Sequence, residues 1–130
     1  MIVVATSVLV ASLVDEGPAG KACASRLTGE DLAAPALLDL EVTSVLRRLL
    51  RGGRIGQDSA GEAMTALPLL PIRRVQHLDL LPRVWELRDN LTPYDASYVA
   101  LAETLGVPLV TGDARLRRAP GVRCAVEVIQ

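Results

Sequence analysis

Glu41 is a carboxylate on the apolar side of a helix that the sequence predicts over Ala36–Arg51. Its helical neighbours Leu37 and Val45 are aliphatic, and no side chain three or four positions away carries a positive charge. Burial of an unpaired carboxylate is unfavourable by several kcal/mol, so the pattern predicts a compensating group, of which a metal ion is one example. Asp39 lies near the other margin of the same apolar arc, and helical spacing alone leaves both acids as candidates.

Asp95 has two possible roles in the segment that begins at Thr92. Thr92 can cap the following helix, with Pro93 at the first helical position, and Asp95 can then complete a capping box. The same residue also shares a helical face with Tyr98 and Ala102, so its side chain is expected to point toward the sheet. The spacing leaves capping and function open as alternatives.

Asp113 directly follows a strand predicted over residues 108–111. It can be a turn residue that caps a short helical segment over Ala114–Arg118. It also stands just beyond the carboxyl end of a strand, which is where ligands bind in open α/β sheets. Thr111, at the tip of that strand, is placed to orient Asp113 through its hydroxyl group.

Carboxylates that gather without histidine or cysteine favour a hard cation such as Mg²⁺ or Mn²⁺. Such an ion can clamp a phosphodiester, polarise its oxygens and lower the pKa of an attacking water. The lone His77 precedes a predicted helix, where a surface or capping role is expected. Cys23 and Cys124 lack metal-ligand spacing and are expected to be free thiols. The sequence shows no glycine-rich phosphate loop and no supported Ser/His/Asp arrangement.

Strands and helices alternate along the chain in the pattern that would bring these acids together. Strands are predicted over residues 2–4, 32–34, 72–76, 108–111 and 124–129, and helices over 8–14, 19–28, 36–51, 57–69, 78–88 and 93–106. This order predicts an α/β fold: a three-layer α/β/α sandwich around a central, mostly parallel sheet of about five strands, in one domain over 1–130.

Composition limits the function classes. The 130 residues carry a formal net charge of -1, which argues against a protein that coats nucleic acid by bulk electrostatics but allows a local basic strip. No stretch reaches the roughly 18 apolar residues of a membrane-spanning helix. The amino-terminal segment lacks a positive region before its apolar run, so no signal peptide and a cytoplasmic location are expected.

Four segments together resemble the PIN-domain ribonucleases of the VapC type. Met1–Val10 resembles the family's opening strand and helix, and Pro35–Val42 its second acidic motif, with Glu41 as the carboxylate. Leu91–Glu103 closely resembles the third motif, with Asp95 in the ligand position, and Pro108–Asp113 resembles the fourth. The order and spacing cover essentially the whole chain, and the third motif with the strand after it is the most specific part.

The resemblance implies a metal-dependent endoribonuclease that acts as the toxin of a VapBC toxin–antitoxin pair. Glu41, Asp95 and Asp113 are then the catalytic carboxylates that bind Mg²⁺ or Mn²⁺, and Ser7 and Thr111 support them. It also implies a homodimer and a VapB-type antitoxin whose carboxyl-terminal tail enters the active-site groove.

Ala5 departs from the family pattern, which has an aspartate at the end of the first strand. Alanine supplies neither a charge nor an oxygen ligand, so a loss of about 100-fold or more in rate is expected. Because the rest of the pattern is intact, we favour deliberate replacement of an aspartate over a degenerate natural copy. The codon at this position in the encoding gene distinguishes the two.

Two arginine clusters differ in what they predict. The cluster Arg47, Arg48, Arg51 and Arg54 indicates a solvated helix end with favourable dipole contacts. Arg115, Arg117 and Arg118 follow Asp113 directly and are the candidates for RNA phosphate contacts.

Two rival interpretations stay open. One is a PIN-fold binding module that keeps its antitoxin and dimer contacts but cleaves nothing, which Ala5 favours. The other is a phosphoryl-acceptor domain, which needs an aspartate after an early strand and a lysine near a late one. Position 5 is alanine and the sole lysine is Lys21, so the second rival is disfavoured.

Overall fold

The computed structural model describes residues 1–130 and contains one five-stranded sheet in which every neighbouring pair of strands is parallel. The strand order is β3-β2-β1-β4-β5. The strands are β1 (Ile2–Val4), β2 (Leu32–Pro35), β3 (Ile72–Val75), β4 (Leu109–Thr111) and β5 (Val126–Val128). The predicted α/β fold and strand number are confirmed, and the sheet is entirely parallel.

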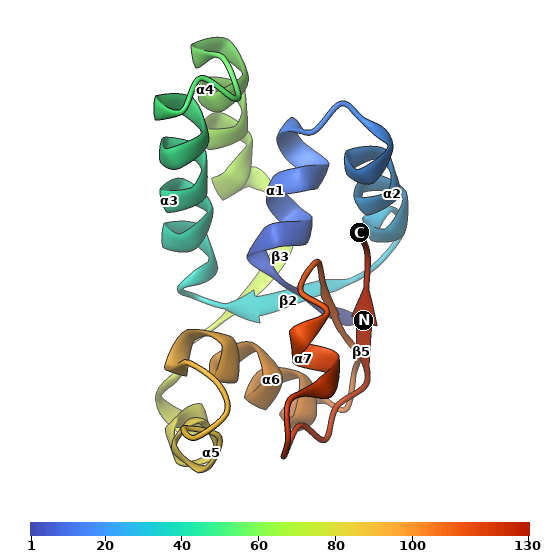
Figure 1. Ribbon diagram of the computed structural model, residues 1–130, viewed down its shortest axis with the longest axis vertical. Helices are drawn as coiled ribbons and strands as arrows, with labels where there is room; N and C mark the ends of the chain where they lie inside the picture. The colour runs from blue at the N-terminus through green and yellow to red at the C-terminus, as the bar shows by residue number, and fades with distance from the viewer.

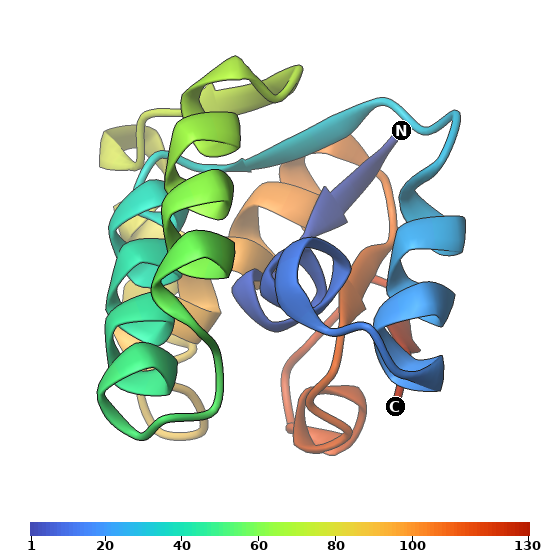
Figure 2. The same ribbon diagram turned by 90° about the horizontal axis from the view of Figure 1, so that it is seen from above.

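Helices cover both faces of this sheet, as the sandwich prediction requires. Helices α1 to α4 lie on one side, and α5 and α6 lie on the other (Figure 1). Viewed from above, α3 and α4 run side by side, with α1 between them and α2 (Figure 2). The helices are α1 (Thr6–Val14), α2 (Pro18–Leu27), α3 (Leu38–Arg51), α4 (Gln57–Ala66), α5 (Leu81–Glu86), α6 (Pro93–Leu105) and α7 (Arg115–Arg118).

Several predicted boundaries shift by a few residues. Pro35 belongs to β2, where it pairs with Val75 at the strand's last position, so its missing N–H removes no bond inside the sheet. The third helix therefore begins only at Leu38, two residues later than predicted. The predicted helix over 57–69 ends at 66 and continues as a 3-10 turn, η1 (Leu67–Leu69), which contains Pro68. The helix predicted over 78–88 is a 3-10 turn, η2 (Leu78–Leu80), followed by α5.

The core is aliphatic and centres on β1 and α6. All three residues of β1 are buried, and β1 lies between β2 and β4 in the middle of the sheet. Seven consecutive residues of α6, from Ala96 to Ala102, are buried as well, because this helix packs on the central strands from the second face. Both cysteines are free thiols, as expected: Cys23 is buried and Cys124 half-buried.

The central strands therefore deliver their following residues to one edge of the molecule. Ala5 follows β1, and Gly112 follows β4. The Gly112 N–H donates to Ser7 Oγ at 3.0 Å, and a Cβ added at Gly112 would come within 3.2 Å of that oxygen. A side chain at position 112 would therefore crowd the Ser7 hydroxyl, which would have to shift by a few tenths of an ångström. None of the helices has the length and apolar character needed to cross a membrane.

Candidate active site at the carboxyl edge of the sheet

A pocket of about 160 Å³ lies at this edge and brings together side chains from four parts of the chain. Six of its residues are ones that the sequence singled out: Ala5, Ser7, Glu41, Asp95, Thr111 and Asp113. Its other residues are Thr6, Tyr98 and Leu116. The three candidate carboxylates therefore line one pocket, although they are far apart along the chain. That they bind a metal stays a prediction.

Two hydroxyl groups hold Glu41 in the pocket. Thr6 Oγ1 donates to Glu41 Oε1 at 3.0 Å, and the Tyr98 hydroxyl donates to the same oxygen at 2.7 Å. The two hydroxyl oxygens are also 2.9 Å apart. Burial raises the pKa of Tyr98 far above its usual range, so the phenol stays a proton donor. Within the chain, Glu41 is thus compensated by two hydroxyl groups and forms no ion pair with an arginine, lysine or histidine side chain.

The sequence pattern does not identify Thr6 and Tyr98 as parts of the site. It indicates a helix start at Thr6, and it places Tyr98 only as one member of the face that it shares with Asp95. One chemical argument could have pointed to Tyr98. A buried tyrosine hydroxyl usually finds a hydrogen-bond partner, and the buried face of α6 is otherwise nearly all apolar, so the partner of Tyr98 is expected on another element.

Thr92 is the N-cap of α6, and Asp95 takes part in this cap through its main-chain N–H. Its N–H donates to Thr92 Oγ1 at 3.2 Å, but its carboxylate makes no return bond to the Thr92 N–H. The capping box suggested by the sequence is therefore only half formed, and the half-buried carboxylate faces the pocket. Burial raises the pKa of Asp95, and the nearby charges of Asp113 and Glu41 raise it further.

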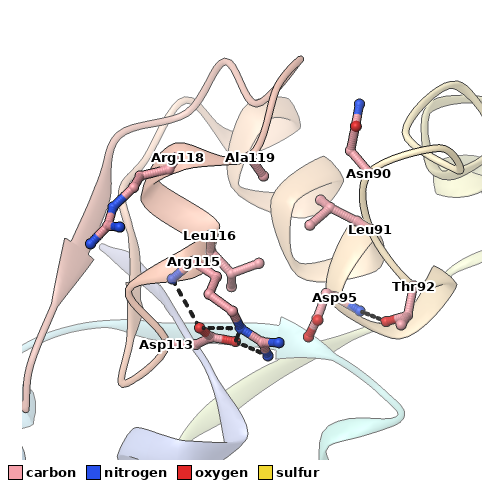
Figure 3. A pocket seen from close by; sticks show the side chains of 9 residues that line it. All are labelled: Asn90, Leu91, Thr92, Asp95, Asp113, Arg115, Leu116, Arg118 and Ala119. Atoms are coloured by element: carbon pink, nitrogen blue, oxygen red, sulfur yellow. Dashed lines mark hydrogen bonds and ion pairs between the residues drawn. The ribbon is translucent and has the colours of Figure 1, made fainter.

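Asp113 is held by its own turn and by Arg115. Its N–H donates to Thr111 Oγ1 at 3.1 Å, so Thr111 orients the residue through its backbone and makes no bond to the carboxylate. The Arg115 N–H donates to Asp113 Oδ1 at 2.9 Å, and the Arg115 guanidinium reaches both carboxylate oxygens, with Nη2 to Oδ2 at 2.7 Å (Figure 3). This guanidinium lowers the pKa of Asp113.

Asp39, the alternative to Glu41, is excluded from the pocket by its ion pair. Arg74 on β3 contacts both Asp39 oxygens, with Nε to Oδ2 at 2.9 Å. The same guanidinium also donates to the carbonyl oxygens of Leu67, Leu70 and Ile72. Asp39 therefore has a structural role, because it holds the Arg74 guanidinium that anchors the chain between α4 and β3.

The three arginines after Asp113 differ in position. Arg115 and Arg118 line a second pocket of about 350 Å³, which shares Asp95 and Asp113 with the first, whereas Arg117 lines neither pocket. The Arg118 guanidinium points away from both carboxylates (Figure 3). In the first cluster, Arg48 and Arg51 are exposed in the last turn of α3, as expected for a solvated helix end. His77 is also exposed.

The oxygen ligands in the pocket are of the type that a hard divalent cation prefers, but too few of them are close together to enclose an ion. Every charged group in the pocket is a carboxylate, which suits Mg²⁺ or Mn²⁺. No three acidic, histidine or cysteine side chains are close enough to enclose one ion in this arrangement. Two features explain the gap: Asp113 is turned onto Arg115, and position 5, only 8% exposed, carries a methyl group.

Fold and site together define a three-layer α/β domain with an acidic pocket at the carboxyl edge of a parallel sheet. The PIN domain family model matches residues 2–122, and the chain belongs to this family.

Relatives and solved structures agree with this assignment. The chain is 47% identical to Ribonuclease VapC1 of Mycobacterium tuberculosis over 98 residues, which are 75% of this chain and 74% of the relative. It is 40% identical to VapC ribonuclease Mb0985 of Mycobacterium bovis over 129 residues, 99% of this chain and 98% of the relative.

Two solved structures share the fold at lower identity. VapC20 (Rv2549c) of M. tuberculosis, described as a sarcin-ricin loop cleaving toxin, matches with a TM-score of 0.66 and 20% identity over 84% of this chain and 87% of that one. VapBC2 of Rickettsia felis, bound to a DNA fragment from its promoter, matches with a TM-score of 0.70 and 14% identity over the full length of both chains.

Proposed function

We propose that this chain is a VapC-type endoribonuclease, the toxin of a type II toxin–antitoxin system, whose catalysis is weakened by Ala5. One observation carries the proposal: Glu41, Asp95 and Asp113 line the same pocket as Ala5, at the carboxyl edge of the sheet. Two ribonucleases of the VapC type are 40% and 47% identical to this chain. The protein is expected to act in the cytoplasm, where its RNA substrate is found.

The proposed cofactor is Mg²⁺ or Mn²⁺, held by Glu41, Asp95 and Asp113. When bound, such an ion supplies Lewis-acid polarisation of the phosphodiester and lowers the pKa of the attacking water. The chain's own part is to position the oxygens. The Thr6 and Tyr98 hydroxyls fix one oxygen of Glu41, and Thr111 fixes the turn that carries Asp113.

Restoring the missing carboxylate tests the proposal. Ala5→Asp is expected to raise the Mg²⁺-dependent cleavage of single-stranded or stem-loop RNA by about 100-fold or more, because a charged ligand returns beside the scissile phosphate. The double variant Ala5→Asp with Glu41→Gln is the matched control and should return to the level of the parent chain. If Ala5→Asp folds normally and cleaves no RNA, the ribonuclease proposal is wrong.

The second candidate function is an inactive binding module, which the buried methyl of Ala5 favours. In that case Ala5→Asp would gain no activity, whereas a VapB-type antitoxin would still bind. The antitoxin is the proposed protein partner under both functions. Its carboxyl-terminal tail is expected to enter the groove beside the acidic pocket, and Arg115 and Arg118 offer cationic contacts to an acidic segment there.

A homodimer is proposed through an exposed apolar surface on η2, α5 and the start of α6. Leu78, Leu81 and Trp85 follow one another at helical spacing and are 60%, 47% and 68% exposed, and Tyr94, which is 62% exposed, shares a small pocket with Leu81. Apolar groups gathered in this way mark interaction surfaces. Trp85→Glu should shift the protein to a monomer in light scattering after gel filtration. An unchanged dimer mass would place the interface elsewhere.

A further inference from the structure

The Arg115 guanidinium lies where it neutralises the acidic pocket from inside the chain. It contacts both oxygens of Asp113 and stands between Asp113 and Asp95 in the second pocket (Figure 3). Its positive charge also lowers the pKa of Asp95, against the stronger effects of burial and of the two neighbouring acids. Arg115 is thus a monovalent cation that the chain supplies to its own carboxylates.

This contact is easy to release. The Arg115 side chain is 88% exposed, and Asp113 is its only hydrogen-bonding partner. An ion pair of this exposure contributes little to stability. The backbone bonds that fix Asp113, from its own N–H to Thr111 and from the Arg115 N–H to Oδ1, do not depend on the guanidinium. Arg115 can therefore leave without disturbing the turn that carries the carboxylate.

We propose that Arg115 is an exchangeable counter-ion: it occupies Asp113 until a divalent cation takes that carboxylate, and the freed guanidinium then binds the RNA backbone. The inference rests on the proposed function, because it needs a metal and an RNA at this edge. It adds a coupling between the two ligands. Arg115 lowers the affinity for the metal, and the release of Arg115 by the metal makes RNA binding depend on the metal.

Charge and geometry favour RNA phosphate as the second partner of Arg115. A guanidinium that leaves Asp113 still lines the larger pocket, which opens beside the acidic one and offers no other carboxylate than Asp95 and Asp113. A phosphate diester presents paired anionic oxygens that match the same fork of donors. The larger pocket shares Asp95 and Asp113 with the acidic one, so an RNA strand bound in the acidic pocket lies next to Arg115.

Calorimetric titration with Mn²⁺ tests the first half of the exchange. Arg115→Ala is compared with Arg117→Ala, which removes the same charge from the same short helix but lines neither pocket. Arg115→Ala is expected to bind Mn²⁺ about two- to fivefold more tightly than the parent chain, the range set by an exposed ion pair. Arg117→Ala should match the parent, and Arg115→Lys should fall between them because it keeps the charge without the fork. Equal Mn²⁺ affinities in Arg115→Ala and Arg117→Ala overturn the exchange, as does a lack of Mn²⁺ binding in all three variants.

Two further readouts follow the guanidinium itself. In the parent chain, the Arg115 Nε–H resonance should lose its protection from solvent exchange during Mg²⁺ titration, in step with the shift of the Asp113 amide. Mn²⁺ should also raise the affinity for a labelled single-stranded RNA more in the parent and in Arg117→Ala than in Arg115→Ala. An Nε–H signal that stays protected at saturating Mg²⁺ contradicts the inference.

These outcomes separate the inference from the function. If Ala5→Asp cleaves RNA while Arg115→Ala and Arg117→Ala bind Mn²⁺ equally, the ribonuclease proposal stands and the counter-ion role of Arg115 is wrong. If Ala5→Asp cleaves no RNA, the ribonuclease proposal is wrong, whatever the Mn²⁺ affinities of the Arg115 variants are.

Discussion

Two groups of acidic side chains in this molecule differ in how their charge is compensated. Away from the pocket, Asp39, Glu103 and Glu127 each contact an arginine at 2.7 to 2.9 Å, and the three arginine side chains are only 19% to 26% exposed. In the pocket, Glu41 and Asp95 contact no arginine at all, and Asp113 contacts one that is 88% exposed.

The difference shows where the chain tolerates uncompensated charge. Structural acids are paired with arginines that are themselves held in place, as when Arg83 contacts both Glu103 and Glu86. The pocket acids instead lie close enough to repel one another, and burial and this repulsion raise the pKa of Asp95. Perturbed carboxylates of this kind gather at functional sites, where stability is given up for ligand binding.

The largest expected effect separates the two groups by activity. In the Ala5→Asp background, Asp95→Asn should lower RNA cleavage by about 100- to 1,000-fold, the loss typical of a group that stabilises transition-state charge. Glu127→Gln, which removes a structural acid, should leave cleavage within about twofold and change only stability. Comparable losses in both variants would mean that the pocket is not the catalytic centre. The measurement is the initial rate on a labelled RNA.

The sequence predicts some features of the fold and of the pocket but not the contacts that distinguish the two groups of acids. The parallel sheet and its carboxyl edge followed from the alternation of strands and helices, whereas the choice of Glu41, Asp95 and Asp113 as one set depended on the resemblance to VapC-type PIN domains. The hydrogen bonds that Thr6 and Tyr98 make to Glu41 could not be predicted, because they join residues 35 and 57 positions apart. A helical wheel gives the direction of a side chain but not its partner. For the same reason, helical spacing did not separate Asp39 from Glu41, and the structural reason for the difference is the ion pair of Asp39 with Arg74, which is 35 positions away in the sequence.

The hydroxyl support of Glu41 gives the next effect. Tyr98→Phe in the Ala5→Asp background should lower cleavage by about tenfold, because groups that orient a metal-binding carboxylate typically contribute 10- to 100-fold. The phenyl ring keeps the packing of α6, so the melting temperature should change little. Circular dichroism melting and RNA cleavage on the same sample check both halves. A Tyr98→Phe chain with full activity would mean that Thr6 alone positions Glu41.

A smaller effect on stability contrasts two arginines. Arg74→Ala should lower the free energy of unfolding by about 2 kcal/mol, since it removes charged hydrogen bonds to Asp39 and to three carbonyl oxygens, of which those of Leu67 and Leu70 keep a backbone N–H donor. Arg115→Ala should stay within about 0.5 kcal/mol of the parent, because its side chain is solvated. Urea unfolding measures both. Equal losses would remove the distinction between structural and pocket arginines.

The smallest effect depends on pH. The pKa of Asp95 is raised in the folded chain, so ionised Asp95 destabilises the fold at neutral pH, and this penalty disappears as pH falls below its unfolded pKa. Asp95→Asn should therefore raise the melting temperature at pH 7, and the gain should vanish in acid. Glu127 has the opposite sign, because Arg26 lowers its pKa: its contribution is present at neutral pH and lost as pH falls. Thermal melts of Asp95→Asn and Glu127→Gln across this range check both signs.

Anomalous diffraction from crystals of Ala5→Asp soaked in Mn²⁺ shows whether the pocket acids share one metal ion. We predict one strong manganese peak between the carboxylate introduced at position 5 and those of Glu41, Asp95 and Asp113, with the Arg115 guanidinium moved off Asp113. A peak elsewhere, or no peak while Arg115 still holds Asp113, would mean that these acids do not form a metal centre.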